Sequence, residues 1–562
     1  MSAVLKAQEP GARYLAAVQP GLVRQFDLLA GAPGGVGRLR ELILALAVQG
    51  KLVRQNLCDE PASALLKRIG MERTRLAAAG KSGRSTGLTP DDESEPPSSL
   101  PTGWAWSTLA SIGVINPRIN ADGDQVASFV QMSSIPVAFT DAHVTEPRRW
   151  RDIKSGFTQF AEGDVGVAKI TPCFENGKST VFQNLSNGIG AGTTELHIVR
   201  PLGRISPRYV LLFLKNPSFL RDGEATMTGT AGQKRLPRTY FENSPFPLPP
   251  LAEQARIVAR VDELMRLCDA LEAKGRLEAE QHARLLGTLL GTLTDSGTPE
   301  ELAANWQRVA AHFDLLLDRP EAVDALEQTI LQLATSGRLT ARSPRDETSL
   351  TGANDRPNLA QPFDEPPGWA WVTVGQLTTL VTSGSRGWKD FYAAEGATFI
   401  RSQDIKFDRL AFDNRAYVKL PPSAEGVRTQ VRPKDVLITI TGANVGKAAV
   451  VATPLSEAYV SQHVALVRLK DPRLTDYLHL WLVNEHGGRR LLLASSYGAK
   501  PGLNLQNIKD LPVPLPPLEE QARIVARVTD LRRLCADLRQ RLDASQTTQS
   551  HLADALVDCA AS

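Results

Sequence analysis

Cysteine is scarce in this chain of 562 residues, which contains five cysteines. None of them lies in a CxxC pair or at a Cys/His spacing typical of zinc ligands, which argues against a metal centre or a disulfide framework. Cys268 and Cys535 occupy equivalent points of an internal repeat, on the apolar face of an expected helix. We therefore expect both to be small core residues.

Long apolar runs are missing as well. No stretch approaches the ~20 apolar residues that cross a bilayer, and the first residues have no apolar segment followed by a small-residue cleavage site. We therefore expect a cytoplasmic protein without a membrane span. The composition, 42% hydrophobic and 22% charged, is that of a globular chain, and the length exceeds what one core usually serves, so several domains are expected.

A strong excess of charge is also absent. The formal net charge is +3 and the isoelectric point is about 8.5. A domain that holds nucleic acid by charge alone is expected to have an isoelectric point above about 9. A DNA-binding role must therefore depend on where individual cations lie, or on partner proteins.

Two glycine–lysine segments resemble a phosphate-binding loop without matching its pattern. In the segment that ends "ENGKST", Pro172 stands where the loop needs its first glycine, and in "GANVGKAA" no serine or threonine follows Lys447. An NTPase site is therefore not expected.

The segment "NPSF" at Asn216 resembles the loop that holds a flipped adenine in N6-adenine methyltransferases, but Ser218 replaces its second proline. No glycine-rich cofactor loop follows a strand upstream, so we prefer to interpret it as a turn that ends a helix. Neither a Ser/His/Asp set nor a pair of carboxylates at catalytic spacing stands out. We predict no catalytic site in this chain.

What the sequence does have is a doubled architecture. The segment "PLPPLAEQARIVARV", which ends at Val261, recurs with one substitution as "PLPPLEEQARIVARV", which ends at Val528. A second repeat aligns Gln25–Leu52 with His312–Leu339 without gaps. The chain therefore consists of two related halves.

Variable stretches lie between these repeats. They begin alike, with "PTGWAWSTL" at Pro101 and "PPGWAWVTV" at Pro366, and each ends on a "PLPPL" segment. Both contain short β-rich runs such as "DVGVAKITP" and "DVLITITG", separated by Gly, Pro and Asn. We expect each variable stretch to form a mixed α+β domain.

Apolar residues after each "PLPPL" segment follow the alternating steps of four and three of a heptad seam, which predicts long helices that pack against each other. Prolines in the first turn, with Glu253 and Glu520 near the positive end of the helix dipole, are typical of a helix start. We expect the seam residues to position the domains and not to contact DNA. They are Ile257, Val261, Leu264, Ile524, Val528 and Leu531.

The order of the repeats predicts a circular arrangement with pseudo-twofold symmetry. The central helical module is complete, whereas the outer one is split between the two ends of the chain, which would meet in space. The predicted parts are an N-terminal helical segment that completes the distal module (1–58), a helix and flexible linker (59–100), a first variable domain (101–248), a central helical region (249–340), a linker (341–362), a second variable domain (363–515) and a C-terminal helix (516–562).

The two variable domains share polar, basic loops at equivalent places. One is "TMTGTAGQKRLPRTYF" from Thr226 and the other is "SSYGAKPGLNLQNIKD" from Ser495, each shortly before a "PLPPL" segment. Glycine lets a loop approach another backbone closely, Gln and Asn can pair with adenine, and Lys or Arg can contact phosphate or guanine. Such loops are more often solvated surface, but their recurrence favours a binding function.

Over the whole chain these motifs resemble the DNA-specificity (S) subunit of type I restriction-modification systems. Subunits of this family have two target recognition domains, each begun by "P.GW.W..L" and ended by "PLPPL.EQ.RIV..V..L". The first variable domain also has "AKITPCFENGK" and "GTAGQKRLP", similar to one recognition-domain subtype. In the second, Lys434 stands where the family commonly has glycine, which puts the local turn in doubt.

The resemblance implies a function. Each recognition domain would read one half of a bipartite, asymmetric double-stranded DNA target, and the helices, as an antiparallel coiled coil, would set the spacer and dock two N6-adenine methyltransferase (M) subunits. Those partners would bring S-adenosylmethionine and flip the target base, and restriction (R) motor-nuclease subunits that use ATP and Mg would join them. The chain itself would be non-catalytic and hold no cofactor or metal.

Position and chemistry together select candidate DNA-binding residues in both variable domains. For each, the alternative is a solvated surface group. The candidates are Lys169, Lys178, Gln233, Lys234, Arg235, Arg238, Arg386, Lys447, Lys500, Asn504, Gln506 and Asn507.

Two other functions stay open on the sequence. A single-chain DNA methyltransferase or nuclease would bind S-adenosylmethionine or cut DNA without partners. A helical interaction scaffold would lack sequence-selective DNA binding even together with a methyltransferase.

Overall fold

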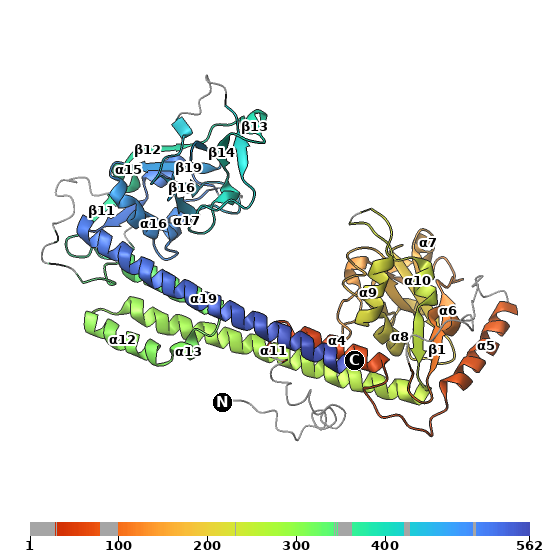
Figure 1. Ribbon diagram of the computed structural model, residues 1–562. Helices are drawn as coiled ribbons and strands as arrows, with labels where there is room; N and C mark the ends of the chain where they lie inside the picture. Colours follow the sequence, from red (N-terminus) through yellow and green to blue (C-terminus); the bar gives the residue numbers. More distant parts are fainter. Residues whose placement is uncertain are drawn as a thin grey trace. The chain divides into compact units, whose positions relative to one another are not determined.

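The computed structural model describes residues 29, 31–78, 99–230, 232–341, 343, 346, 362–420, 428–497 and 502–561. The chain divides into two compact units (Figure 1). Unit 1 comprises Met1–Leu277 with Gln546–Ser562, and unit 2 comprises Glu278–Ser545. Each unit contains one variable domain and parts of both long helices.

The first variable domain consists of three small sheets and short helices. Its first and last strands, β1 and β10, pair antiparallel, with Ala105 opposite Leu248. The other sheets have the orders β2-β9-β6-β7 and β4-β3-β8-β5, and β3 runs parallel to β8. The strands are β1 (Ala105–Thr108), β2 (Gly113–Ile115), β3 (Val126–Val130), β4 (Glu146–Arg149), β5 (Thr158–Ala161), β6 (Val165–Ala168), β7 (Ser179–Val181), β8 (Ile189–Gly192), β9 (Leu196–Pro201) and β10 (Pro245–Leu248), and the helices are α6 (Leu109–Ile112), α7 (Trp150–Ile153), α8 (Pro207–Leu214), α9 (Pro217–Thr226) and α10 (Arg238–Asn243).

The second variable domain repeats this plan. Strands β11 and β20 pair antiparallel, a second sheet has the order β12-β19-β16-β17, and a third has the order β13-β15-β14-β18 with β14 parallel to β18. The two mixed α+β domains expected from the sequence are therefore present and share one topology. The elements are β11 (Ala370–Thr373), β12 (Thr378–Ser383), β13 (Tyr392–Ala393), β14 (Ala397–Ile400), β15 (Ala416–Val418), β16 (Val436–Thr439), β17 (Ala448–Val450), β18 (Ala458–Val460), β19 (Val464–Leu469), β20 (Pro512–Leu515), α15 (Val374–Leu377), α16 (Thr475–Val483), α17 (Gly488–Ala494) and α18 (Leu505–Lys509).

An equivalent buried contact occurs within each of the two domains. The Tyr209 hydroxyl donates to the carbonyl of Pro247 at 2.9 Å, and the Tyr477 hydroxyl donates to the carbonyl of Pro514 at 2.6 Å. Both tyrosines are fully buried, so each hydroxyl needs such a partner. In each domain, the proline-rich last strand is therefore fixed to an equivalent helix, α8 in the first domain and α16 in the second.

The turn at Lys434 forms in spite of the missing glycine. Lys434 has a φ of 68°, in the left-handed region, and Gly163 has a φ of 82° at the corresponding turn of the first domain. Lys434 Nζ donates to both carboxylate oxygens of Asp476, at 3.0 and 2.8 Å. The doubt raised by this departure from the family pattern therefore does not extend to the fold of the turn.

The repeated short helices α4 (Gly35–Val48) and α14 (Pro320–Thr335) each end at a glycine that contacts a variable domain. Gly50 has a φ of 70°, and a β-carbon there would lie 2.5 Å from Pro101 Cγ and 2.9 Å from Trp104 Cζ2. Gly337 has a φ of 73°, and a β-carbon there would approach Pro366 and Trp369 to 3.2 Å. Both positions need glycine for its backbone freedom, and Gly50 also for its lack of a side chain. This contact explains why the short-helix repeat and the "P.GW" segment occur together.

The two long helices are α11 (Leu251–Asp295) and α19 (Leu518–Ala561), 45 and 44 residues long. At ~1.5 Å per residue, each extends over roughly 65 Å. In unit 1, the first half of α11 shares a core with α4 and with Ala553 near the end of α19. In unit 2, the first half of α19 shares a core with α14 and with Leu286, Leu290 and Leu293 of α11.

The heptad seams lie in these cores, as expected. Of the six seam residues, five are at most 3% exposed, and Leu531 is half-buried against the core of unit 2. Cys268 and Cys535 are also buried and free of disulfides, which confirms that they are small core residues. The remaining helices are α5 (Ala62–Ala78) in unit 1 and α12 (Pro299–Ala311) and α13 (Phe313–Leu316) in unit 2.

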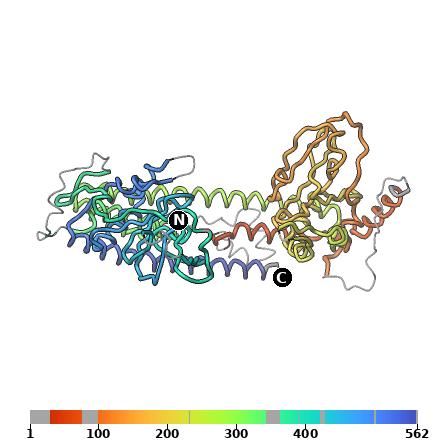
Figure 2. Tube along the Cα trace, turned by 90° about the horizontal axis from the view of Figure 1, so that it is seen from above, coloured from red at the N-terminus to blue at the C-terminus, as the bar shows by residue number. Residues whose placement is uncertain are grey.

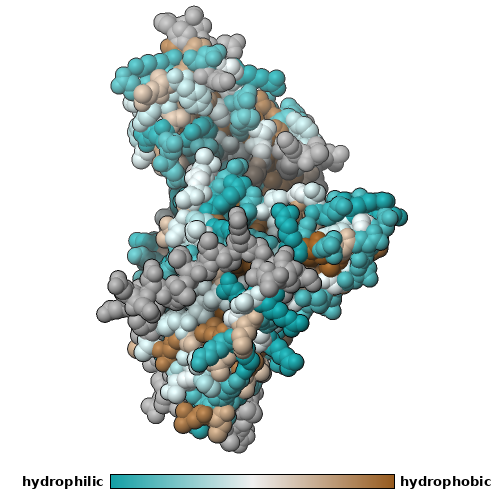
Figure 3. Space-filling view, turned by 90° about the vertical axis from the view of Figure 1, so that its right-hand side faces the viewer, coloured by the Kyte–Doolittle hydropathy of each residue, from teal (hydrophilic) through white to brown (hydrophobic). Residues whose placement is uncertain are grey.

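In unit 1, the end of α19 lies beside α4 (Figure 2). The Arg38 guanidinium donates to Ser550 at 2.8 Å and also pairs with Asp554. Segments from the two ends of the sequence thus share one unit. Among the described helices, none combines the length and apolarity that a membrane crossing requires. The face in Figure 3 is largely hydrophilic, with apolar side chains in small groups.

Candidate nucleic-acid interface

A loop between α9 and α10 projects from the first variable domain. Its ends form a two-bond bridge, because Thr228 and Arg235 exchange N–H···O bonds of 3.1 and 2.8 Å. The loop is tied to the segment after β6, since the Leu236 amide donates to the carbonyl of Lys169 at 2.7 Å. Gln233 and Lys234, both exposed, lie in the loop just before Arg235. The base of this loop is therefore fixed while its polar side chains face solvent.

A loop of the second variable domain occupies the equivalent place, between α17 and α18. The Tyr497 amide donates to the carbonyl of Gly502 at 3.1 Å, and the Leu503 amide donates to the carbonyl of Ile440, just after β16, at 2.9 Å. Residues 498–501 are not described, so the candidate Lys500 lies outside the described residues. Both domains thus support a polar loop on the segment after the third strand of the same sheet.

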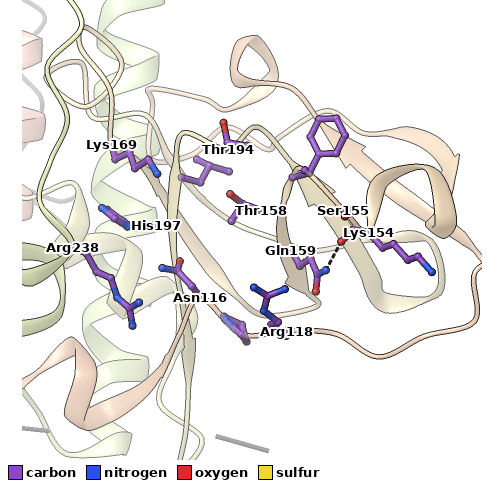
Figure 4. A pocket seen from close by; sticks show the side chains of 14 residues that line it. Asn116, Arg118, Lys154, Ser155, Thr158, Gln159, Lys169, Thr194, His197 and Arg238 are labelled. Atoms are coloured by element: carbon purple, nitrogen blue, oxygen red, sulfur yellow. Dashed lines mark hydrogen bonds between the residues drawn. The ribbon is translucent and has the colours of Figure 1, made fainter. Parts of the chain in front are cut away.

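The first domain also has an open groove of about 500 Å³ beside its loop (Figure 4). Strands β6 and β9 bring Lys169 and His197 to one side, next to Arg238 at the start of α10, and Arg118 and Lys154 come from separate loops. None of its lining residues, all of which are described, is acidic. The full lining is Asn116, Pro117, Arg118, Lys154, Ser155, Gly156, Phe157, Thr158, Gln159, Lys169, Thr194, Leu196, His197 and Arg238.

The groove is positively charged through its lysines and arginines and not through its histidine. Burial lowers the pKa of His197 to about 4, and the nearby cations Lys169 and Arg238 lower it further. Its Nε2 donates to the carbonyl of Leu236 at 3.1 Å. His197 is therefore neutral near pH 7 and helps to hold the base of the loop. The four cations with no acidic neighbour in the lining suit an anionic ligand such as a phosphate backbone.

Several candidate residues make contacts within the protein. Lys178 Nζ donates to the carbonyl of Met132 at 2.9 Å, and Arg235 pairs with Glu195 at 2.9 Å. Arg238 Nε donates to Glu242 at 2.6 Å, although its side chain remains 53% exposed. These contacts orient the cations, and in Arg235 and Arg238 they also offset part of the charge.

The candidates of the second domain come from separate segments of the chain. Asn504 and Asn507 cap the start of α18, each accepting a bond from the other's backbone amide at 2.9 and 2.7 Å. Gln506 donates to Asp510 at 2.7 Å. Arg386 is exposed in the loop after β12, and Lys447 is half-buried before β17. The asparagines therefore have a structural role in addition to any contact with a ligand.

The sequence motifs missed five groove residues: Asn116, Arg118, Lys154, Gln159 and His197. Asn116, Arg118, Lys154 and Gln159 belong to no repeat or recognisable motif, whereas His197 lies in the β-rich segment "TELHIVRP". The sheet order β2-β9-β6 brings Asn116 and Arg118, which follow β2, beside His197 of β9. Lys154 follows α7 and Gln159 lies in β5 of the other sheet, so they reach the groove from a second part of the domain. No signal in the sequence identifies them without this tertiary arrangement.

The segment "NPSF" is a turn between two helices. The Asn216 side chain accepts a bond from the Ser218 amide at 2.8 Å and caps α9, while its amide nitrogen donates to the carbonyl of Leu44 at 3.4 Å. The interpretation as a helix-ending turn is confirmed. Within the described ranges, no group of three His, Cys, Asp or Glu side chains is placed to hold a metal ion.

Two domains of one topology, each with a polar loop at the same place, define a duplicated recognition protein. The family model described as "Type I restriction modification DNA specificity domain" matches residues 423–545. The chain is 39% identical over 563 residues to the specificity subunit of the type I restriction enzyme EcoEI of Escherichia coli, and the match covers 94% of each chain. It is 39% identical over 554 residues to the EcoAI specificity subunit of Escherichia coli, again over 94% of each chain.

The fold also agrees with a solved structure. A chain of a type I R-M system superposes with a TM-score of 0.53 at 20% sequence identity, over 83% of this chain and 99% of that one. The protein belongs to the family of type I restriction enzyme specificity subunits. The predicted resemblance is thereby confirmed, as is the prediction that the chain is the non-catalytic, DNA-recognising subunit.

Proposed function

We propose that each variable domain reads one half of a bipartite, asymmetric DNA target. The observation that carries this proposal is the repeated placement of a polar loop on the same strand extension, with Leu236 bonded to Lys169 in one domain and Leu503 bonded to Ile440 in the other. Two readers with one scaffold and different loop sequences suit a target with two different halves.

In the first domain, the groove and the loop contact different parts of the DNA. Lys169, Arg118 and Lys154 contact phosphates, which fixes the register of the domain on the duplex. Gln233 and Lys234, whose side chains are exposed on the loop, contact base edges, where Gln suits adenine and Lys suits guanine. In the second domain, the loop near Gln506 and the cations Arg386 and Lys447 have the same functions.

The long helices serve as spacer and docking surface. They run antiparallel, carry the two recognition domains in a pseudo-twofold arrangement, and bind two N6-adenine methyltransferase subunits, through which ATP-dependent restriction subunits assemble. The buried seams at Ile257 and Ile524 support this proposal, because they fix the first half of each long helix in the core of one unit. S-adenosylmethionine, ATP and Mg belong to the partners.

The test is a comparison of methylated adenines in the source genome with and without this chain. We expect one motif of two defined halves and a gap of constant length to lose methylation when the chain is removed. Its return with the intact chain, but not with a chain in which the exposed Gln233 and Lys234 are both replaced by Ala, would tie the reading to the loop. A motif that persists without the chain, or has no gap, contradicts the proposal.

A further inference from the structure

The short repeated helices contact the long helices through ion pairs of opposite polarity. In unit 1, Arg40 of α4 lies against two acids of α11, with Nη2 2.8 Å from Asp269 Oδ1 and 2.7 Å from Glu272 Oε2. The cation is on the short helix and the acids are on the long one.

In unit 2 the polarity is reversed. Arg539 of α19 lies against two acids of α14, with Nη2 2.6 Å from Asp324 Oδ1 and 3.0 Å from Glu327 Oε2. A second arginine of α19, Arg532, pairs with Glu327 at 2.9 Å. Here the acids are on the short helix and the cations are on the long one.

The reversed pairs occupy equivalent positions. In the ungapped repeats, Arg40 aligns with Glu327 and Glu272 aligns with Arg539. The apolar contacts around them are alike, since Ile43 and Ile330 are both buried and the long helices share the sequence "EQARIVARV". The apolar faces would therefore accept either short helix, whereas the charges accept only one.

An exchanged pairing would bring like charges together. Helix α14 on α11 would set Asp324 and Glu327 against Glu272 and Asp269, and α4 on α19 would set Arg40 against Arg539. Like charges at packed helix positions disfavour an assembly, and opposite ones select the partner, as they do at the flanking positions of coiled coils.

Chain order makes this discrimination useful. Helix α14 follows α11 after only the short helices α12 and α13, whereas its own partner α19 starts at Leu518. Because domains fold as they are synthesised, the wrong long helix is available to α14 first. We propose that the reversal of charge assigns each short helix to its own long helix, and that it prevents exchange of the two within one chain or between two copies.

The test uses three forms of the full chain refolded from denaturant. One variant combines Arg40→Glu, Asp269→Ala and Glu272→Arg, which gives these three positions of unit 1 the residues that unit 2 has there and preserves an ion pair in each unit. A second variant adds Asp324→Gly, Glu327→Arg, Arg532→Met, Ala536→Asp and Arg539→Glu, so that both polarities are reversed and again differ. Light scattering measures the monomer fraction, and hydrogen exchange measures protection of α4 and α14.

We expect the first variant to lose monomer to larger species and to show two exchange populations for α4 and α14. The second variant is expected to refold like the unaltered chain. If the first variant refolds to monomer with wild-type protection, or if the second fails to recover, charge polarity does not assign the helices and the proposal is overturned.

Discussion

Asp164, which is fully buried, accepts two hydrogen bonds from the guanidinium of Arg200, at 2.7 and 2.8 Å. The same pair recurs in the second domain, where Asp435 accepts bonds of 2.8 and 2.7 Å from Arg468. In each domain the pair links the turn before a central strand to the neighbouring strand, so it fixes the sheet that supports the recognition loop.

Replacing Arg200 with Met should destabilise the first variable domain selectively. Burial already raises the pKa of Asp164 in spite of Arg200, and without the guanidinium the buried carboxylate has no counter-charge. Breaking a fully buried pair costs about 3–5 kcal/mol, and we expect a smaller loss here because the Arg200 side chain is 34% exposed. Hydrogen exchange should therefore increase across residues 113–201 and not across 378–469. The matched variant Arg468→Met should show the converse, and an equal response of both domains would contradict this assignment.

Removing one groove cation should weaken DNA binding without changing sequence preference. Lys169→Ala is expected to lower the slope of log K against log salt concentration by about 1, because one phosphate contact releases about one counterion. The measurement is a salt titration of target and non-target DNA binding by the assembled methyltransferase complex.

Arg204→Ala is the control for this variant. Arg204 is exposed and follows the C-terminal end of β9, whereas His197, in the groove, lies near the N-terminal end of the same strand. It should leave the slope unchanged. If the two variants behave alike, or if Lys169→Ala alters base preference, the groove does not bind backbone phosphate.

Lengthening both long helices should widen the gap in the target. Seven residues inserted after Leu277 in α11 and after Ser545 in α19 preserve the heptad phase and add about 10.5 Å, at ~1.5 Å per residue. At ~3.4 Å per base pair, this predicts a gap about three base pairs longer, with both half-sites unchanged. Mapping of methylated adenines gives the gap directly, and an unchanged gap would refute the spacer function.

Stability of the first domain should rise with pH above neutrality. Lys215 Nζ donates to the carbonyls of Val137 and Gly177 at 2.7 and 3.0 Å, and burial lowers its pKa to about 7. An unfolded lysine has a pKa of about 10.4. Between these values the unfolded state binds a proton that the folded state does not, so the free energy of unfolding increases as pH rises through this range.

The urea midpoint of the first domain, measured at intervals from pH 7 to pH 10, should reveal this increase. Lys215→Met removes the titrating group, so its midpoint should vary less over the same range. Equal pH dependence in the two proteins would show that Lys215 does not titrate there.

The helical parts of the fold were predictable from the sequence because their signals are local. Heptad spacing through Ile257 and Ile524 and the prolines before them define α11 and α19, and repeats define the two halves. Some strands were also predictable, since the β-rich run "DVGVAKITP" contains β6. Packing of Gly50 on Trp104 was not predictable, since it joins segments separated by a linker.

The candidate site was predictable only in part, for a physical reason. Gln233 and Lys234 lie in a repeated loop, so position alone singled them out. The groove cations Arg118 and Lys154 share a groove with Lys169 through the tertiary fold, which sequence spacing does not encode. Lys178 looked like a free cation and instead holds the carbonyl of Met132.

The most direct test of the account is to exchange one reader. Residues 101–248 are replaced with the recognition domain of a specificity subunit that has a different target, and methylated adenines are mapped. The account predicts that one half of the motif changes to that of the donor while the other half and the gap stay the same. A change in both halves, or in neither, would contradict the claim that each variable domain reads one half.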